Sequence, residues 1–196
     1  MRNPEATKEL IILKSADLFN TQGYKATSLS DITKATGFTK GAIYRHFENK
    51  EDLERQALHS LSKRMFKEIS TSIKAATNFQ EKMEAIFIFF EGYMETPLYQ
   101  GGCPLLNAAI ESDDANPIIK EQALVMLSRL KESMHILFQN GIKNNQIKST
   151  IAIDYYITIF IAILEGGIMM SRLENNKTAI THAINHLRNL VKEIVI

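Results

Sequence analysis

This chain lacks the sequence features of several large classes of protein. It has one cysteine in 196 residues, Cys103, which excludes an internal disulfide framework and suits a reducing compartment. It contains no glycine-rich phosphate loop, HExxH or Gly-x-Ser-x-Gly pattern, so we do not expect an enzyme. The most apolar run, residues 155–164, is too short to span a membrane, and Asp154 and Glu165 bracket it, so we expect a buried helix. The N-terminus is charged and amphipathic, unlike a signal peptide, and we expect a cytoplasmic protein.

Helical patterns run along the whole chain, without alternating strand patterns, internal repeats or low-complexity tracts. We therefore expect an all-α fold of about nine helices. Proline and glycine mark one loop at 96–104, and the sequence SDDANP marks a second break at 112–117. Beyond residue 49, helices are predicted over about 50–76, 79–95, 105–111, 118–140, 149–173 and 176–195. In the N-terminal helix, an inward stripe is formed by Ile11, Ile12, Ser15, Ala16 and Phe19.

Residues 27–53, TSLSDITKATGFTKGAIYRHFENKEDL, are the most informative segment. Ser28 can cap a helix, and Asp31 three residues later suits a capping box. Ile32 and Ala35 are predicted to give this helix an inward face, and Gly37 to end it. Two short helices joined by a tight turn, with a third helix behind them, are the layout of a helix-turn-helix DNA reader. The alternative is an ordinary helical hairpin.

The second short helix has the chemistry to read DNA. Thr39 can cap it, and Ile43 and Phe47 share a face that anchors it inward. Small residues would let its backbone approach a groove, Arg45 can reach a guanine edge, and its polar neighbours suit phosphate oxygens. The candidate DNA contacts are Ser28, Thr39, Lys40, Gly41, Ala42, Tyr44, Arg45, His46 and Lys50.

Three stretches carry a resemblance to a known family: SADLFNTQGY (15–24), TSLSDIT (27–33) and TGFTKGAIYRHFENKEDL (36–53). Residues 6–53, about a quarter of the chain, resemble the DNA-binding domain of TetR-type (tetracycline-repressor-like) transcription regulators. The family usually has a small residue at the position of Thr33. We expect this difference to affect only the local packing on the inward side of the first helix.

The resemblance implies a role for most of these residues. Phosphate contacts fall on Thr39, Tyr44, His46 and Lys50, and the base-reading region is Lys40, Gly41, Ala42 and Arg45. It also implies a homodimer and an all-helical ligand-binding domain. A small molecule would then release the DNA, so the protein would most often be a repressor, although activation stays open. We accordingly divide the chain into a DNA-binding domain, 1–50, and a ligand-binding and dimerisation domain, 51–196.

The charge of the chain is uneven in a way that fits this interpretation. Residues 1–47 carry seven Lys and Arg against four Asp and Glu, a net charge of +3, whereas the whole chain has +1, which leaves −2 for the remainder. A basic N-terminal part on a mildly acidic remainder suits specific binding of double-stranded DNA with modest electrostatic steering. Ordinary scatter of surface charge would give a similar excess. A dimer with two recognition helices one helical turn apart would read a palindromic operator.

The last two helices are predicted to form the dimer. The final helix has an apolar stripe at three-and-four spacing, and the helix before it is apolar on nearly all sides, so that helix needs partners on two faces. Gly166 and Gly167 would permit close helix approach. The stripe consists of Ile180, Ala183, Ile184, Leu187, Val191 and Ile194. In the alternative, both helices pack within one subunit.

Eight methionines and ten phenylalanines favour a flexible cavity for a largely apolar effector. Residues of these types more often form plain core than contact a ligand. The sharper candidates are polar groups in apolar surroundings, namely Asn107, Glu165 and Tyr93. Beside Phe66, the candidate ligand contacts are Phe87, Phe90, Tyr93, Met94, Leu106, Asn107, Ile110, Met126, Leu130, Met134, Phe160, Leu164, Glu165 and Met169.

Two further groups of residues have simpler interpretations than a functional site. His182 and His186 have the spacing of two metal ligands on one helix face, but no nearby Cys or carboxylate completes a set except Glu193, so we expect neither a metal nor a cofactor. Cys103 would be a redox sensor only if it were reactive, and a small buried hydrophobe is favoured. The competing function is a small-molecule binding or interaction module whose helix-turn-helix is vestigial.

Overall fold

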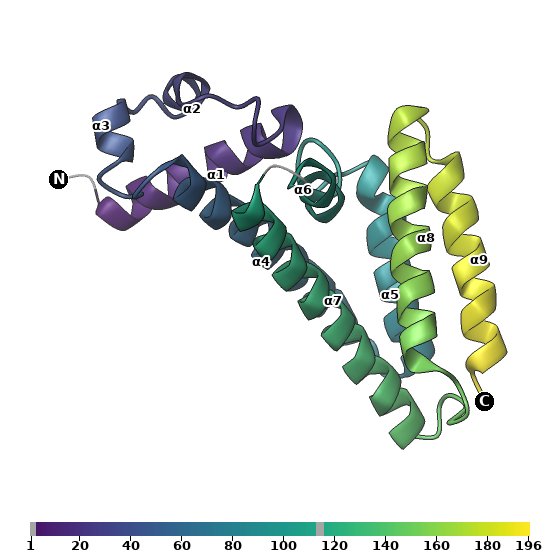
Figure 1. Ribbon diagram of the computed structural model, residues 1–196. Coiled ribbons are helices and arrows are strands. Elements are labelled where there is room, and N and C mark those ends of the chain that lie inside the picture. Colours follow the sequence, from purple (N-terminus) through teal and green to yellow (C-terminus); the bar gives the residue numbers. More distant parts are fainter. Residues whose placement is uncertain (1–2, 113–115) are drawn as a thin grey trace. The chain divides into compact units, whose positions relative to one another are not determined.

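The structure is a computed structural model that describes residues 3–112 and 116–196, apart from the side chain of Met94. Over these ranges it consists of α-helices, one 3-10 helix, loops and an isolated β-bridge between Ile147 and Val195, which confirms the predicted all-α fold (Figure 1). The elements are α1 (Pro4–Gln22), α2 (Leu29–Thr36), α3 (Lys40–Ile43), α4 (Lys50–Ala75), α5 (Phe79–Glu91), η1 (Gly92–Met94), α6 (Pro104–Ser112), α7 (Pro117–Lys143), α8 (Ile153–Leu173) and α9 (Thr178–Ile194).

Most predicted helix ends agree with the structure to within a few residues. The largest differences are at the end of α5, which gives way to the 3-10 helix η1 at Gly92, and at the start of α8, which begins at Ile153. The helix α7 continues past Gly141, although glycine predicted its end. A Cβ atom at Gly141 would lie 2.9 Å from the Phe79 ring and 3.1 Å from Ile147, so this glycine serves close packing instead of termination.

The chain divides into two compact units. The first comprises residues 1–64 and 99–127, and the second comprises residues 65–98 and 128–196, so α4 and α7 each contribute to both. The first unit therefore contains α6 and the start of α7 in addition to the predicted DNA-binding region. The division into functional domains at residue 50 stays a prediction, since compactness does not test it.

Local capping signals set the helices of the first unit. The Ser28 hydroxyl accepts from the Asp31 amide, and the Asp31 carboxylate accepts from the Ser28 amide, which is the predicted capping box. Gly37 ends α2 with the left-handed φ of 71° that a non-glycine residue rarely adopts. Ile32 is buried as predicted, but Ala35 is exposed, so that prediction was wrong. The inward side of α2 follows Leu29, Ile32 and Thr36 instead.

A hydrogen-bonded contact, which we call the α6 clamp, fixes α6 to the end of α1. The clamp consists of Asn107 and Glu111. The Glu111 carboxylate accepts from the backbone amides of Tyr24 at 2.8 Å and Lys25 at 2.6 Å. The Asn107 amide donates to the Asn20 carbonyl at 3.2 Å and to the Asn20 side chain at 3.1 Å. Residues more than 80 positions apart in the sequence are therefore held together within the first unit.

The clamp also depends on close backbone approach at one glycine. Gly101, with φ of 91°, lies against the Asn20 carbonyl, where a Cβ atom would come within 2.1 Å of the oxygen. The Asn20 side chain in turn donates to the Gly102 carbonyl at 3.0 Å. A left-handed φ and this lack of space both require glycine at position 101.

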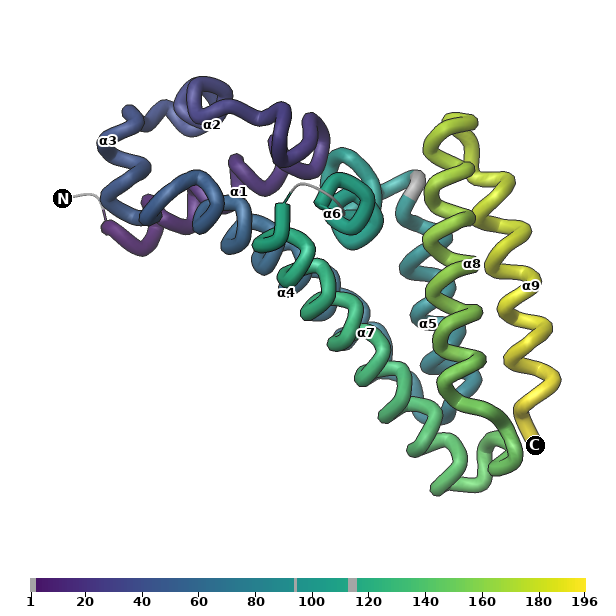
Figure 2. Tube along the Cα trace, in the orientation of Figure 1, coloured from purple at the N-terminus to yellow at the C-terminus, as the bar shows by residue number. Residues whose placement is uncertain are grey.

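In the second unit, α9 packs against both α5 and α8, as Figure 2 shows for the yellow, teal and green traces. The apolar stripe of α9 is fully used in this packing, since Ile180, Ile184, Leu187, Val191 and Ile194 are all buried. At Gly167 of α8, a Cβ atom would lie 2.9 Å from that of Ala183, so the glycine permits the two helices to approach closely. The core continues through rings stacked or edge-on at Phe79, Phe87, Phe138 and Phe160.

Candidate nucleic-acid interface and ligand cavity

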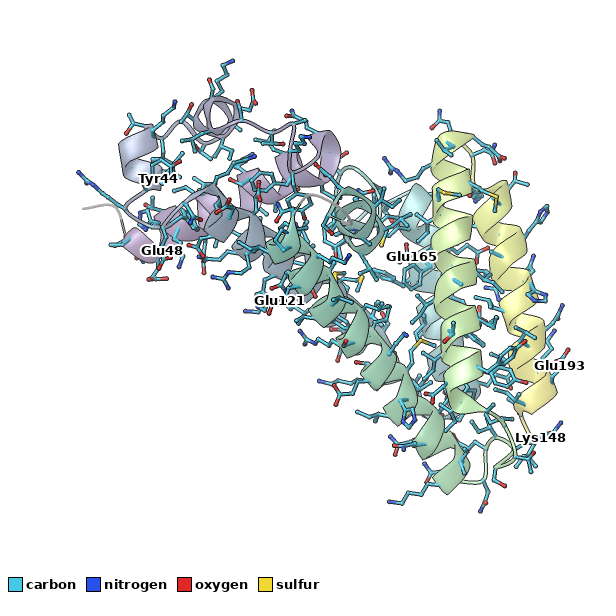
Figure 3. All side chains as sticks on the ribbon, in the orientation of Figure 1. Tyr44, Glu48, Glu121, Lys148, Glu165 and Glu193 are labelled. Carbon is cyan, nitrogen blue, oxygen red and sulfur yellow. The ribbon has the colours of Figure 1, made fainter. Side chains whose placement is uncertain are left out.

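The helix α3 presents most of the predicted DNA contacts on an exposed surface of the first unit. Lys40, Gly41, Tyr44 and Arg45 are exposed, and Ala42 and His46 are half-buried. Thr39 caps the helix as predicted, because its hydroxyl accepts from the amide of Ala42. Figure 3 labels Tyr44 beside α3.

Two buried side chains fix the orientation of this surface. Ile43 and Phe47 are 0% and 3% exposed, as their predicted anchoring role requires. The helix itself ends at Ile43, and residues 44–46 form a turn, so Phe47 is reached through the turn and not along a continuous helix. A Cβ atom at Gly41 would meet no heavy atom within 4 Å, so the opposite side of α3 is open to a partner.

Ser28 and Lys50 carry structural interactions in addition to their predicted DNA contacts. The Ser28 hydroxyl donates to Asp31 at 2.6 Å, and this bond, followed by that from the Ser28 amide, holds the pKa of the Asp31 carboxyl below its usual value. The Lys50 ammonium donates to the Tyr24 carbonyl at 2.7 Å and pairs with Glu54 at 3.0 Å. A phosphate contact from either residue stays a prediction, and it would share groups that the fold already uses.

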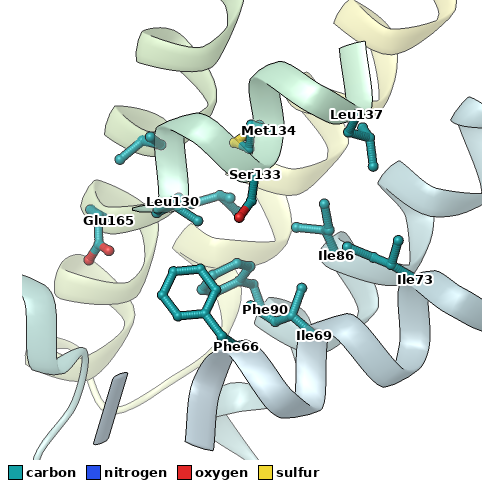
Figure 4. A pocket seen from close by; sticks show the side chains of 12 residues that line it. Phe66, Ile69, Ile73, Ile86, Phe90, Leu130, Ser133, Met134, Leu137 and Glu165 are labelled. Carbon is teal, nitrogen blue, oxygen red and sulfur yellow. The ribbon is translucent and has the colours of Figure 1, made fainter. Parts of the chain in front are cut away.

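A largely apolar cavity of about 60 Å³ lies in the second unit (Figure 4). Six residues proposed as ligand contacts line it, and they come from α4, α5, α7 and α8: Phe66, Phe90, Leu130, Met134, Leu164 and Glu165. Six more lining residues were not predicted, namely Ile69, Ile73, Ile86, Ser133, Leu137 and Ile161. Helical spacing from Phe66 to Ile69 and Ile73, and from Leu130 to Ser133 and Leu137, could have indicated them.

The remaining candidates with described side chains do not line this cavity. Phe87 and Phe160 stack on each other in the core with ring centroids 6.0 Å apart, and Tyr93 is buried. Ile110 and Met169 are exposed. Asn107 belongs to the α6 clamp, so its polar group serves the fold of the first unit. Leu106 and Met126 also belong to the first unit, and the side chain of Met94 lies outside the described residues.

The apolar stripe of α9 is buried within the chain apart from half-buried Ala183, and a dimer through the last two helices stays a prediction. A more exposed apolar face lies on α8. It consists of Tyr155, Ile159, Ala162, Gly166, Met170 and Leu173, at spacings of three and four residues. Tyr155 and Leu173 are 60% and 80% exposed, and a Cβ atom at Gly166 would meet nothing within 4 Å. By length and composition α8 could also cross a membrane, which a single apolar helix supports weakly.

The structure also shows the surroundings of the histidine pair on α9 and of Cys103. His182 and His186 are exposed on α9, and among the described residues no three His, Cys, Asp or Glu side chains are grouped as metal ligands would be. Cys103 is buried, as its interpretation as a small hydrophobe predicts.

Comparisons with known proteins agree with this geometry. The family model described as "Bacterial regulatory proteins, tetR family" matches residues 11–57, and that described as "Tetracyclin repressor-like, C-terminal domain" matches residues 80–187. The HTH-type transcriptional regulator LmrA of Bacillus subtilis is 27% identical over 95% of this chain and 97% of its own. The HTH-type transcriptional repressor DhaR of Mycobacterium sp. is 24% identical over 87% and 84%. The crystal structure of a TetR transcriptional regulator from Chloroflexus aurantiacus is 34% identical, with a TM-score of 0.95 over all of both chains.

Lys50 is expected to stabilise the fold in the absence of DNA. The Lys50→Met substitution leaves the buried Glu54 carboxylate without its cation, so the free energy of unfolding should fall by about 2 kcal/mol. Urea denaturation of the free protein at neutral pH measures this free energy. The double variant that combines Lys50→Met with Glu54→Gln should regain part of the lost stability.

The matched control is Arg55→Met, one turn away. Arg55 pairs with Asp52 at 2.6 Å, but its side chain is 52% exposed, so the loss should stay below about 1 kcal/mol. Equal losses in the two variants would show that the Lys50–Glu54 pair has no special structural role.

Proposed function

This chain belongs to the TetR family of DNA-binding transcriptional regulators, and on that premise we propose that it is a homodimeric repressor that binds a palindromic operator and is released by a small molecule. It would act in the cytoplasm, where it meets its operator. The observation that carries the proposal is the capped helix α3, anchored by Ile43 and Phe47, with exposed Arg45 and an open side at Gly41. The relative DhaR is a transcriptional repressor, which supports repression over activation.

In the proposed complex, α3 enters the major groove. Lys40 and Arg45 are exposed cations that can reach base edges, where arginine pairs with guanine. Tyr44 and His46 flank them and suit phosphate oxygens. Gly41 and Ala42 leave room for close approach of the backbone.

The uncovered face of α8 supports the proposed homodimer. Apolar side chains repeat along it with Gly166 midway, so a second copy of α8 could pack closely against it. In a dimer related by a two-fold axis the same face serves both subunits. Two recognition helices one helical turn apart would then read the two halves of a palindrome.

The helix α4 supports the proposed release of DNA by a ligand, because it both lines the cavity and contacts the DNA-binding region. Phe66, Ile69 and Ile73 of α4 line it, and the same helix begins at Lys50, which bonds to the turn after α1. A ligand that favours one arrangement of α4 would shift the balance between states that bind DNA well and poorly. The α6 clamp offers a second connection to the same turn, because Glu111 binds the amides of Tyr24 and Lys25.

The first test is the selection of DNA from the source genome. Purified protein is incubated with genomic fragments at about 0.15 M salt, where nonspecific phosphate binding is already weakened, and retained fragments are sequenced. We expect a few fragments that share one inverted repeat. If folded, dimeric protein retains nothing above background, the interaction-module hypothesis is favoured.

Arg45 is expected to contact DNA bases, and Tyr44 is expected to contact the phosphate backbone of the DNA. Against the selected operator and a scrambled duplex, Arg45→Ala should reduce the preference for the operator by about tenfold or more, because a base contact is lost. Tyr44→Phe should weaken both duplexes alike. Fluorescence anisotropy measures both affinities, with Lys143→Ala on α7 as the control for loss of a positive charge. An unchanged preference in Arg45→Ala removes that residue from the base-reading set.

The α8 face is expected to hold the dimer together. Ala162→Glu places a carboxylate in the middle of this face, which should raise the dimer dissociation constant by roughly 100-fold, since a charge would be buried without a partner. Sedimentation equilibrium measures it. Ile136→Glu, at an exposed apolar position on α7, is the matched control and should remain dimeric. A monomeric wild-type protein, or an unaffected Ala162→Glu dimer, would contradict this arrangement.

A further inference from the structure

The cavity of the second unit continues into a larger outer groove. The inner cavity and the groove share five lining residues, namely Phe66, Ile69, Ile73, Ser133 and Leu137. The groove has a volume of about 520 Å³, against about 60 Å³ for the inner cavity. Ligand sites usually span roughly 300–1,000 Å³, so a ligand must place most of its volume in the groove and only an end in the cavity.

The two ends of this continuous site differ in charge. Lys74 and Lys82 line the groove together with the side-chain amides of Asn140, Asn144 and Gln146, and no carboxylate is among its lining residues. Neither lysine forms an ion pair with the described residues. The nearest carboxylate along α5, Glu81, accepts bonds from the Thr77 amide and hydroxyl, and these bonds hold its pKa below the usual value. The groove therefore presents positive charge to a ligand.

At the other end, the lining is apolar apart from Ser133 and Glu165 (Figure 4). Apolar groups of a ligand would meet Ile86, Phe90 and Leu164 there. Lys82 at the groove and Phe90 in the cavity lie eight residues apart on α5, a separation on the order of 12 Å along a helix axis. The site thus has a small apolar inner end and a larger outer groove that carries the cations.

We propose that the effector is an amphiphile with an anionic head. The end of its apolar chain enters the cavity between Phe66 and Phe90, and the rest of the chain lies in the groove with the head at Lys74 and Lys82. This inference rests on the proposed ligand-controlled function and specifies the chemistry of its ligand.

The test compares three probes with the same alkyl chain: decanoate, 1-decanol and decyltrimethylammonium. Binding to the full-length protein is measured by isothermal titration calorimetry below the micelle concentration. We expect decanoate to bind at least about tenfold more tightly than the other two, a difference typical of a charge-assisted contact. Equal affinities, or tightest binding of the cation at Glu165, would overturn the proposal.

Variants locate the head and the chain separately. Lys74→Gln combined with Lys82→Gln should abolish the preference for decanoate and leave the affinity for decanol unchanged. Ser133→Leu, which narrows both hollows, should weaken decanoate and decanol alike. The charge control is Lys131→Gln, on a different hollow of α7, and it should change nothing. Retention of the decanoate preference without Lys74 and Lys82 would contradict the proposed head site.

Release of operator DNA is measured separately, so the two proposals can fail independently. If decanoate binds as expected and leaves the DNA complex intact, the ligand class stands and ligand-controlled release is wrong. If decanoate does not bind while an unrelated compound releases the DNA, release stands and the anionic class is wrong.

Discussion

The contact on which the first unit most depends is the bond between the Glu111 carboxylate and two backbone amides, those of Tyr24 and Lys25. These amides follow the end of α1, where a helix gives way to a turn and backbone donors need partners from elsewhere. A carboxylate that accepts two amide hydrogens is a strong, charge-assisted acceptor. Gly23 makes room for it, since a Cβ atom there would lie 3.0 Å from both carboxylate oxygens.

Because of this contact, the compact unit that contains the DNA-reading helices also includes α6. A small helix that follows the predicted loop at 96–104 is fixed to the turn leading into α2, so the DNA-reading part is supported by residues far along the chain. The Lys50 ammonium binds the carbonyl of Tyr24, whose amide binds Glu111. Movement of either α4 or α6 would therefore act on the same peptide segment. The turn that leads into α2 is therefore held by contacts from both α4 and α6.

Sequence reasoning succeeded where the cause is local and failed where the partner is distant. The capping box at Ser28, the left-handed Gly37 and the cap at Thr39 each involve residues within three or four positions, so the sequence alone predicts them. Six of the twelve residues that line the cavity were predicted. Helical spacing indicates which residues share a face, but it does not indicate whether that face borders a cavity. Asn107 was assigned to the cavity as a polar group in an apolar segment. Its partner Asn20 is 87 residues away, and no local pattern reveals that pairing.

The last two helices show a related limit of periodicity. A single apolar stripe, as on α9, requires one neighbouring surface, and the chain supplies it from α5 and α8. A helix that is apolar on nearly all sides requires more than one. In α8 the two adjacent glycines lie on different faces of the helix. Gly167 packs against Ala183 within the chain, whereas Gly166 faces open space. The number of apolar faces, and not the regularity of one stripe, therefore indicates which helix keeps an apolar face exposed after the chain has folded.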